Sequence, residues 1–202
     1  MNENLTSPSD EERENLLRYF KNGDYKKTQI IAETHTNKYP NDPLGWQILS
    51  AVSAMIGKLE KSLIASQKLI NLAPDQPSSY INLGGSYHAL GKLEESEKSY
   101  RKAINLDSRN LSANLNLAII LIKLNNLKES EELLNKVIDI DENNFNAYFY
   151  LGKIYNSLQK NDKALISYKK ALSINPNHAD TYANLGSTLI LNSQFEEAEK
   201  NC

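Results

Sequence analysis

The sequence repeats itself every 34 residues, and this period constrains the fold more than any other feature. A leucine followed by a small residue recurs at Leu83-Gly84, Leu117-Ala118, Leu151-Gly152 and Leu185-Gly186. Further columns keep the same period, including an aromatic residue three positions before most of these leucines and a proline or polar turn between copies. Because several columns agree over four to six copies, we predict a stack of repeated units, none of which can bury its apolar face alone.

Each copy contains the pattern of two helices. In the third copy, apolar residues fall at Tyr80, Leu83, Tyr87 and Leu90, and these spacings of three and four place them on one helical face. Gly91 then breaks the helix, and a second apolar pattern follows. We call the first helix of each copy helix A and the second helix B. The predicted fold class is therefore all-α.

Three local features carry more specific expectations. The break between helix A and helix B suits a left-handed residue, and the candidates are Gly57, Gly91, Asn125 and Asn161. Ser7-Pro8 is typical of an N-cap and a first-turn proline that open the first helix. Small residues are expected where helix A contacts helix B of the same repeat, so that a bulky side chain at Gly152 would overpack the contact; these residues are Gly84, Ala118, Gly152 and Gly186.

The period divides the chain into a tail, residues 1–8, and one repeat domain, residues 9–202. The predicted repeats are about five full copies and a truncated sixth, at 9–42, 43–76, 77–110, 111–144, 145–178 and 179–202. The sixth copy stops inside helix B, so we expect a fragment of a longer protein or a truncated product. Its unfinished C-terminal face is a candidate surface for self-association.

Composition excludes several classes of function. Lys and Arg number 23 and Asp and Glu 25, so the near-neutral balance gives no bulk attraction to nucleic acid or to an anionic membrane. The longest apolar run, residues 117–122, is far shorter than the roughly 20 residues of a spanning helix. The N-terminus has no signal-peptide pattern, so a cytoplasmic location is expected. The single cysteine, Cys202, allows neither an internal disulfide nor a cysteine-based zinc site.

No catalytic pattern is present in the sequence. The three histidines, His35, His88 and His178, lie in different repeats, and no phosphate-binding loop or nucleophile motif occurs. Glutamates cluster at the starts of the B helices, where they complement the helix dipole. We therefore expect a non-enzyme with no catalytic residue, no metal and no cofactor.

The columns of Trp or Tyr, Leu, Gly or Ala, Tyr, Ala or Ser, and Pro at this period resemble the tetratricopeptide repeat. The resemblance covers essentially the whole chain after Pro8. It implies a right-handed α-α superhelix in which helix A lines a concave groove and helix B the convex back. It also implies a protein–protein interaction scaffold that binds an extended peptide or partner protein in that groove.

One column of helix A resembles a particular subfamily. The sixth position of this helix holds Ile48, Asn82, Asn116, Tyr150 and Asn184. Three asparagines in five copies are similar to the asparagine ladder of O-linked N-acetylglucosamine transferases. An asparagine amide can both donate to and accept from a peptide backbone, which would grip extended chains with little sequence selectivity. Tyr150 interrupts the ladder, and compositional drift or family inheritance is the alternative explanation for the asparagines.

The remaining predicted groove residues are apolar or basic. Leu115, Ile119 and Phe149 are expected to supply apolar contacts, although some of them could instead pack against the next helix A. Lys153 completes the predicted set. No pair of helices matches the Lys/Asn and Lys/Arg pattern of the carboxylate clamp for chaperone C-termini, so that role is disfavoured. The alternative function is the substrate-recruiting region of a glycosyltransferase whose catalytic domain is missing from this chain.

Overall fold

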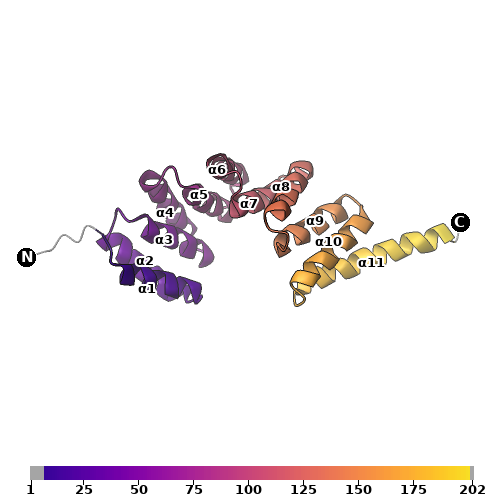
Figure 1. Cartoon of the computed structure of the whole chain (residues 1–202), viewed down its shortest axis with the longest axis horizontal. Coiled ribbons are helices and arrows are strands. Elements are labelled where there is room, and N and C mark those ends of the chain that lie inside the picture. The colour runs from indigo at the N-terminus through magenta and orange to yellow at the C-terminus, as the bar shows by residue number, and fades with distance from the viewer. Residues whose placement is uncertain (1–6, 201–202) are drawn as a thin grey trace, which may run out of the picture. The chain divides into compact units, whose positions relative to one another are not determined.

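The computed structural model describes residues 7–200, and side chains within residues 7–192. Eleven α-helices and no strands are found in this described part, and they pack as consecutive helix pairs, which confirms the all-α repeat fold (Figure 1). The helices are α1 (Asp10–Lys21), α2 (Tyr25–Lys38), α3 (Pro43–Met55), α4 (Leu59–Leu72), α5 (Pro77–Ala89), α6 (Leu93–Leu106), α7 (Leu111–Lys123), α8 (Leu127–Ile140), α9 (Phe145–Ser157), α10 (Asn161–Ile174) and α11 (Ala179–Lys200).

The chain forms two compact units. The first unit comprises Met1–Ala113 and the second Asn114–Cys202. In the first, α1 packs on α2, α3 on α4 and α5 on α6, and each odd-numbered helix also contacts the next odd-numbered one. In the second, α9 packs on α8, α10 and α11. Odd-numbered helices are therefore the A helices of the repeats and even-numbered helices the B helices.

A left-handed residue ends the turn between helix A and helix B in five successive repeats. Gly23, Gly57 and Gly91 have φ angles of 75°, 77° and 73°, and Asn125 and Gln159 have 61° and 57°. The positions are 34 residues apart throughout. The prediction of Asn161 was wrong, because that residue is already the first residue of α10, and Gln159 takes the left-handed conformation despite its side chain.

The first helix begins two residues later than the Ser7-Pro8 prediction. Its N-cap is Ser9, whose hydroxyl accepts a hydrogen bond from the Glu12 N–H at 3.2 Å, while the Glu12 carboxylate accepts one from the Ser9 N–H at 2.9 Å. This reciprocal capping box satisfies two backbone donors at once, which the Ser7-Pro8 arrangement could not do. The Glu12 carboxylate also accepts hydrogen bonds from Lys38 and Tyr39 at the end of α2. Together with the bond from Ser9, they lower the pKa of Glu12 to about 2.

Helix A and helix B of one repeat meet through two positions that are complementary in size. A Cβ added to Gly84 would lie 2.8 Å from the Tyr100 ring, and one added to Gly152 would overlap the Tyr168 ring. The same two columns hold a different pair in each full repeat, and all ten residues are buried: Leu16 and Ala32, Ser50 and Ser66, Gly84 and Tyr100, Ala118 and Leu134, Gly152 and Tyr168. A glycine or alanine thus faces a larger residue in four of these repeats, as close packing requires, and two serines face each other in the second repeat.

The last helix differs from the prediction. Helix α11 continues from Ala179 to Lys200 without the expected break, and a Cβ added to Gly186 would meet nothing within 4 Å. Position 193, where the 34-residue period would place the turn, lies inside this helix.

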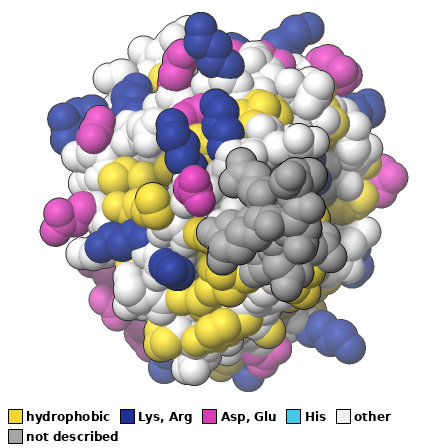
Figure 2. All heavy atoms as spheres, turned by 90° about the vertical axis from the view of Figure 1, so that its right-hand side faces the viewer, with side chains coloured by type: hydrophobic (Ala, Val, Ile, Leu, Met, Phe, Trp, Pro, Cys, Tyr) yellow, Lys and Arg dark blue, Asp and Glu magenta, His cyan; other side chains and the backbone are white. Residues whose placement is uncertain are grey.

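Helix α11 exposes several large hydrophobic side chains. Tyr182, Leu189, Ile190 and Leu191 are exposed large hydrophobic residues on this helix. Figure 2 views the molecule from the side on which α11 lies in Figure 1, and it shows hydrophobic side chains reaching the surface between charged ones. No helix in the described part is long and apolar enough to cross a membrane.

Candidate functional site

The structure distributes the predicted groove residues over four A helices. Seven of them belong to the second unit: Leu115, Asn116 and Ile119 on α7, Phe149, Tyr150 and Lys153 on α9, and Asn184 on α11. The eighth, Asn82, is on α5 of the first unit.

Three of these residues come together in an aromatic cluster on α9. The rings of Phe149 and Tyr150 are 5.3 Å apart, and the Lys153 ammonium lies 5.7 Å from the Phe149 ring centre and 5.8 Å from that of Tyr150. Lys153 is exposed and both rings are partly exposed, so the cluster offers aromatic surface and a positive charge in one place.

Two further residues of the cluster were missed by the sequence analysis. The Phe145 ring stacks on that of Phe149 at 5.9 Å, and the His178 ring lies 4.7 Å from Phe145 and 5.2 Å from Phe149. Phe145 precedes Phe149 by four residues, so helical spacing could have revealed it. His178 comes from the turn before α11, and only the fold brings it to α9. We call these five residues, Phe145, Phe149, Tyr150, Lys153 and His178, the α9 aromatic cluster.

The imidazole of His178 has a defined hydrogen-bonding role. Its Nδ1 accepts from the backbone N–H of Thr181 at 3.3 Å and lies 2.9 Å from the Thr181 hydroxyl. This is the position where Asn144 caps α9, with its side-chain oxygen accepting from Ala147. Because Nδ1 serves as the acceptor, a neutral His178 carries its proton on Nε2. The cap fixes the ring against Phe145 and Phe149.

The cluster rests on the packed core of the second unit. Tyr168 of α10 is fully buried, and its ring centre lies 6.4 Å from that of Phe149. Burial raises the pKa of Tyr168 to about 12 and also raises the pKa of Tyr150. Both phenols are therefore neutral hydrogen-bonding groups near neutral pH.

Two of the three ladder asparagines bond to the backbone of their own helix. The side-chain amides of Asn82 and Asn184 each donate to the backbone carbonyl four residues earlier, Ser78 at 2.9 Å and Asp180 at 2.7 Å. Each of these amides keeps its oxygen and a second N–H for a ligand. Asn116 and its neighbours Leu115 and Ile119 are partly exposed on α7.

No group of three or more His, Cys, Asp or Glu side chains in the described residues is placed to hold a metal ion. The buried His35 of the first unit has a structural environment instead. Its Nε2 lies 2.7 Å from Asp42, and Arg13 donates to the other oxygen of that carboxylate at 3.0 Å. These three side chains link α1, α2 and the start of α3.

Comparison with repeat-family models identifies the repeats. A model described as TPR repeat matches residues 152–192, and two described as tetratricopeptide repeat match residues 75–143 and 133–166. Together they span residues 75–192, more than half of the 202 residues. No curated protein matches the sequence at a significant level.

Solved structures match the chain at low sequence identity. TTC0263, a thermophilic TPR protein of Thermus thermophilus, has a TM-score of 0.77 at 20% identity, over 89% of this chain and 98% of its own. PilW, described as a widely conserved type IV pilus biogenesis factor, has 0.76 at 17%, over 92% and 91%. YrrB, described as a TPR protein with an unusual peptide-binding site, has 0.66 at 14%, over 90% and 92%.

At these identities the likeness concerns the fold alone. It agrees with the helix pairs, with the left-handed residue at each 34-residue step, and with the family models over more than half of the sequence. The chain therefore belongs to the tetratricopeptide repeat family.

Proposed function

We propose that this protein is an interaction scaffold that binds an extended peptide segment of a partner protein on the A helices of its second unit. Tetratricopeptide repeat proteins generally bind protein or peptide partners, and one structural relative, YrrB, is described as having a peptide-binding site. The observation that carries the proposal is the α9 aromatic cluster, in which stacked, partly exposed rings lie beside an exposed lysine.

The chemistry of the cluster favours a particular kind of segment. Phe149 and Phe145 offer apolar surface for an aliphatic or aromatic side chain, and Lys153 can pair with a carboxylate next to it. Asn184 on the neighbouring α11 can accept from a peptide N–H through its side-chain oxygen. Aromatic anchors of this type supply most of the binding energy in protein interfaces.

The role of Asn116 and Asn184 of the asparagine ladder is part of this proposal, whereas Asn82 belongs to the first unit and its role stays a separate prediction. Each asparagine would contribute a backbone hydrogen bond, a smaller effect than that of the aromatic anchor. Association with a glycosyltransferase stays a prediction that rests on the asparagine positions alone.

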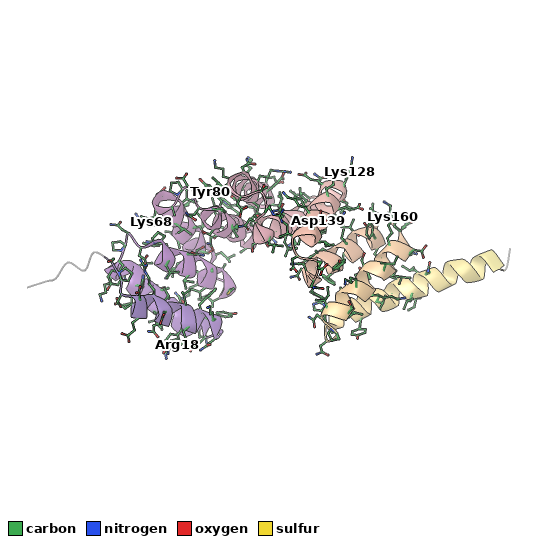
Figure 3. The ribbon with its side chains drawn as sticks, viewed as in Figure 1. Arg18, Lys68, Tyr80, Lys128, Asp139 and Lys160 are labelled. Atoms are coloured by element: carbon green, nitrogen blue, oxygen red, sulfur yellow. The ribbon has the colours of Figure 1, made fainter. Side chains whose placement is uncertain are left out.

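A labelled random-peptide library measured by fluorescence anisotropy tests the proposal. Phe149→Ala should weaken the best peptides by about 30-fold or more, as for an interface anchor, and Asn184→Ala by about 3- to 10-fold, as for one hydrogen bond. Lys153→Gln should weaken only peptides with a carboxylate. Lys160→Gln, the same charge change in the turn before α10, is the matched control and should have no effect (Figure 3). Equal binding by wild type, Phe149→Ala and Lys153→Gln would refute this site.

A further inference from the structure

The B helices carry an exposed isoleucine at one repeated position. Ile30 of α2, Ile64 of α4 and Ile166 of α10 are 65%, 63% and 69% exposed, and they occupy the same column of the 34-residue repeat. In the two other full repeats this column holds Lys98 and Glu132, so the fold does not require an apolar side chain there. Scattered apolar residues on a surface are ordinary, but recurrence at one structural position calls for a physical reason.

In the second unit, Ile166 borders a pocket of about 450 Å³ formed by three helices. Ile138 of α8 and Ile166 of α10 form two of its sides, and Tyr148, Leu151 and Tyr155 of α9 also line it. In Figure 3, Asp139 marks the end of α8 and Lys160 the residue before α10, the two helices between which this pocket lies. We call it the B-helix pocket.

This pocket is separate from the α9 aromatic cluster. Tyr148, Leu151 and Tyr155 are three and four residues apart, so they share one face of α9. At 100° per residue, Phe149 and Lys153 project from the other side of the same helix. Helix α9 thus presents two different surfaces, and the one that lines the B-helix pocket is not part of the proposed peptide site.

Two lysines frame the B-helix pocket. The Lys163 ammonium lies 5.5 Å from the Tyr155 ring centre, and that of Lys170 lies 5.8 Å from the Tyr148 ring centre. Both lysines are on α10, seven residues apart, which corresponds to two turns or about 10 Å. No carboxylate is among the described side chains that line this pocket. Glu131 lies nearby, where it accepts a hydrogen bond from the Tyr155 hydroxyl at 2.7 Å.

The equivalent pocket of the first unit has a balanced charge. It has about 400 Å³ and is lined by Trp46, Leu49 and Ile64, in the columns of Tyr148, Leu151 and Ile166. There Glu33 lines the pocket and pairs with Lys61 at 2.6 Å, and Lys61 lowers the pKa of Glu33. A carboxylate that lines this pocket therefore satisfies its lysine, whereas the described lining of the B-helix pocket places tyrosine rings, and no carboxylate, beside Lys163 and Lys170.

We propose that the B-helix pocket binds an acidic amphipathic helix of a partner protein. An aliphatic side chain of that helix would enter the pocket beside Ile166, and carboxylates one turn before and one turn after it would pair with Lys163 and Lys170. Residues i, i+3 or i+4, and i+7 of a helix share one face and span two turns, which matches the spacing of the two lysines. Charge complementarity selects an acidic segment, and the apolar pocket selects an aliphatic side chain.

The probe is a labelled, helix-favouring 16-residue peptide with Glu at i and i+7 and Leu at i+3. A matched peptide carries Gln in place of both Glu residues. We expect fluorescence anisotropy to show binding of the Glu peptide that is at least 10-fold tighter than that of the Gln peptide. This preference should decrease with salt and disappear in the Lys163→Gln/Lys170→Gln variant.

The chain supplies its own matched substitutions. Ile166→Glu introduces the residue that the fourth repeat already carries at this position, so it should fold, and it should weaken the Glu peptide at least 10-fold. Ile64→Glu makes the same change in the neutralised pocket of the first unit and should leave binding unchanged. Circular dichroism of both variants confirms that they are folded.

Three outcomes would overturn the proposal. The first is no difference between the Glu and Gln peptides. The second is an equal loss in Ile64→Glu and Ile166→Glu. The third is a concentration-dependent dimer in sedimentation velocity that Ile166→Glu abolishes, because the occupant of the pocket would then be a second copy of this chain.

Discussion

The second and fifth repeats build the same contact between helix A and helix B with different chemistry. In the second repeat, Ser50 and Ser66 are both buried, and their hydroxyl oxygens lie 2.5 Å apart. In the fifth, the corresponding residues are Gly152 and Tyr168, and the ring fills the space that a side chain on the glycine would take. The comparison shows that the same two positions accept either two small polar residues or a glycine beside a large aromatic ring.

The Ser50 and Ser66 contact of the second repeat belongs to a larger hydrogen-bond network. Ser86 of α5 lies 2.7 Å from both Ser62 and Ser66 and 3.4 Å from Ser50, so hydroxyls of α3, α4 and α5 meet in one buried cluster. The aromatic version instead leaves the Tyr168 hydroxyl buried with no partner among the described residues. The first arrangement is stabilised by hydrogen bonds and the second by close packing against a ring.

The largest expected effect comes from breaking the size match in the fifth repeat. Gly152→Ala places a Cβ on the Tyr168 ring, and we expect a loss of about 3 kcal/mol in the free energy of unfolding, at the upper end of overpacking effects. Adding Tyr168→Leu recreates the Ala118 and Leu134 pair of the fourth repeat and should recover part of the loss. Guanidinium unfolding followed by circular dichroism measures the coupling between the two changes.

Gly186→Ala is the matched control for this experiment. It makes the same substitution at the equivalent position of α11, where an added Cβ meets nothing within 4 Å. It should stabilise the helix by about 0.5–1 kcal/mol, because glycine is a poor helix former. Destabilisation of both variants to the same extent would contradict the size-matching explanation.

An intermediate effect is expected from breaking the polar cluster of the first unit. Ser86→Ala removes the hydroxyl that Ser50, Ser62 and Ser66 share. Ser50 and Ser66 still bond to each other, but the buried Ser62 hydroxyl loses its partner, and we expect a cost of about 1–2 kcal/mol. Trp46 is the only tryptophan and belongs to this unit, so its fluorescence during unfolding reports the loss. Exposed Ser112→Ala serves as control and should leave the transition unchanged.

Apart from the Gly186→Ala control, the smallest effect is expected from Tyr168→Phe, and this effect is stabilising. Removing a buried hydroxyl that has no partner should raise the free energy of unfolding by about 1 kcal/mol. Tyr100→Phe is the control at the same position of the third repeat, because the hydroxyl of Tyr100 is not a buried, unpaired group. A loss of stability in Tyr168→Phe would show that its hydroxyl has a partner.

Alkaline titration sharpens this prediction. Burial raises the pKa of Tyr168 from 10 in the unfolded chain to about 12 in the folded one. As the pH rises, the unfolded state therefore releases the Tyr168 proton first. The contribution of neutral Tyr168 to the free energy of unfolding is complete below pH 10 and is lost as the pH rises from 10 to 12. Tyr168→Phe should show a smaller loss of stability over this interval than the wild type, by circular dichroism.

Much of the candidate site follows from helical spacing, and the rest does not. Phe149, Tyr150 and Lys153 lie within five residues of one helix, so the sequence could group them. Phe145 follows from the same spacing. His178 does not, because its ring reaches Phe145 only when the turn before α11 packs beside α9. The B-helix pocket also needs three helices before its lysines and isoleucine surround one space.

The sequence by itself determined the 34-residue period, the alternation of A and B helices, and most of the left-handed turns, because these depend on local spacing and on backbone preferences. Tertiary structure decided which residues face each other across each helix pair, since the size of one position sets what fits at another 16 residues away. It also decided that α11 runs on without a turn. There residues 179–200 form one continuous helix, on which Leu189 and Ile190 are exposed.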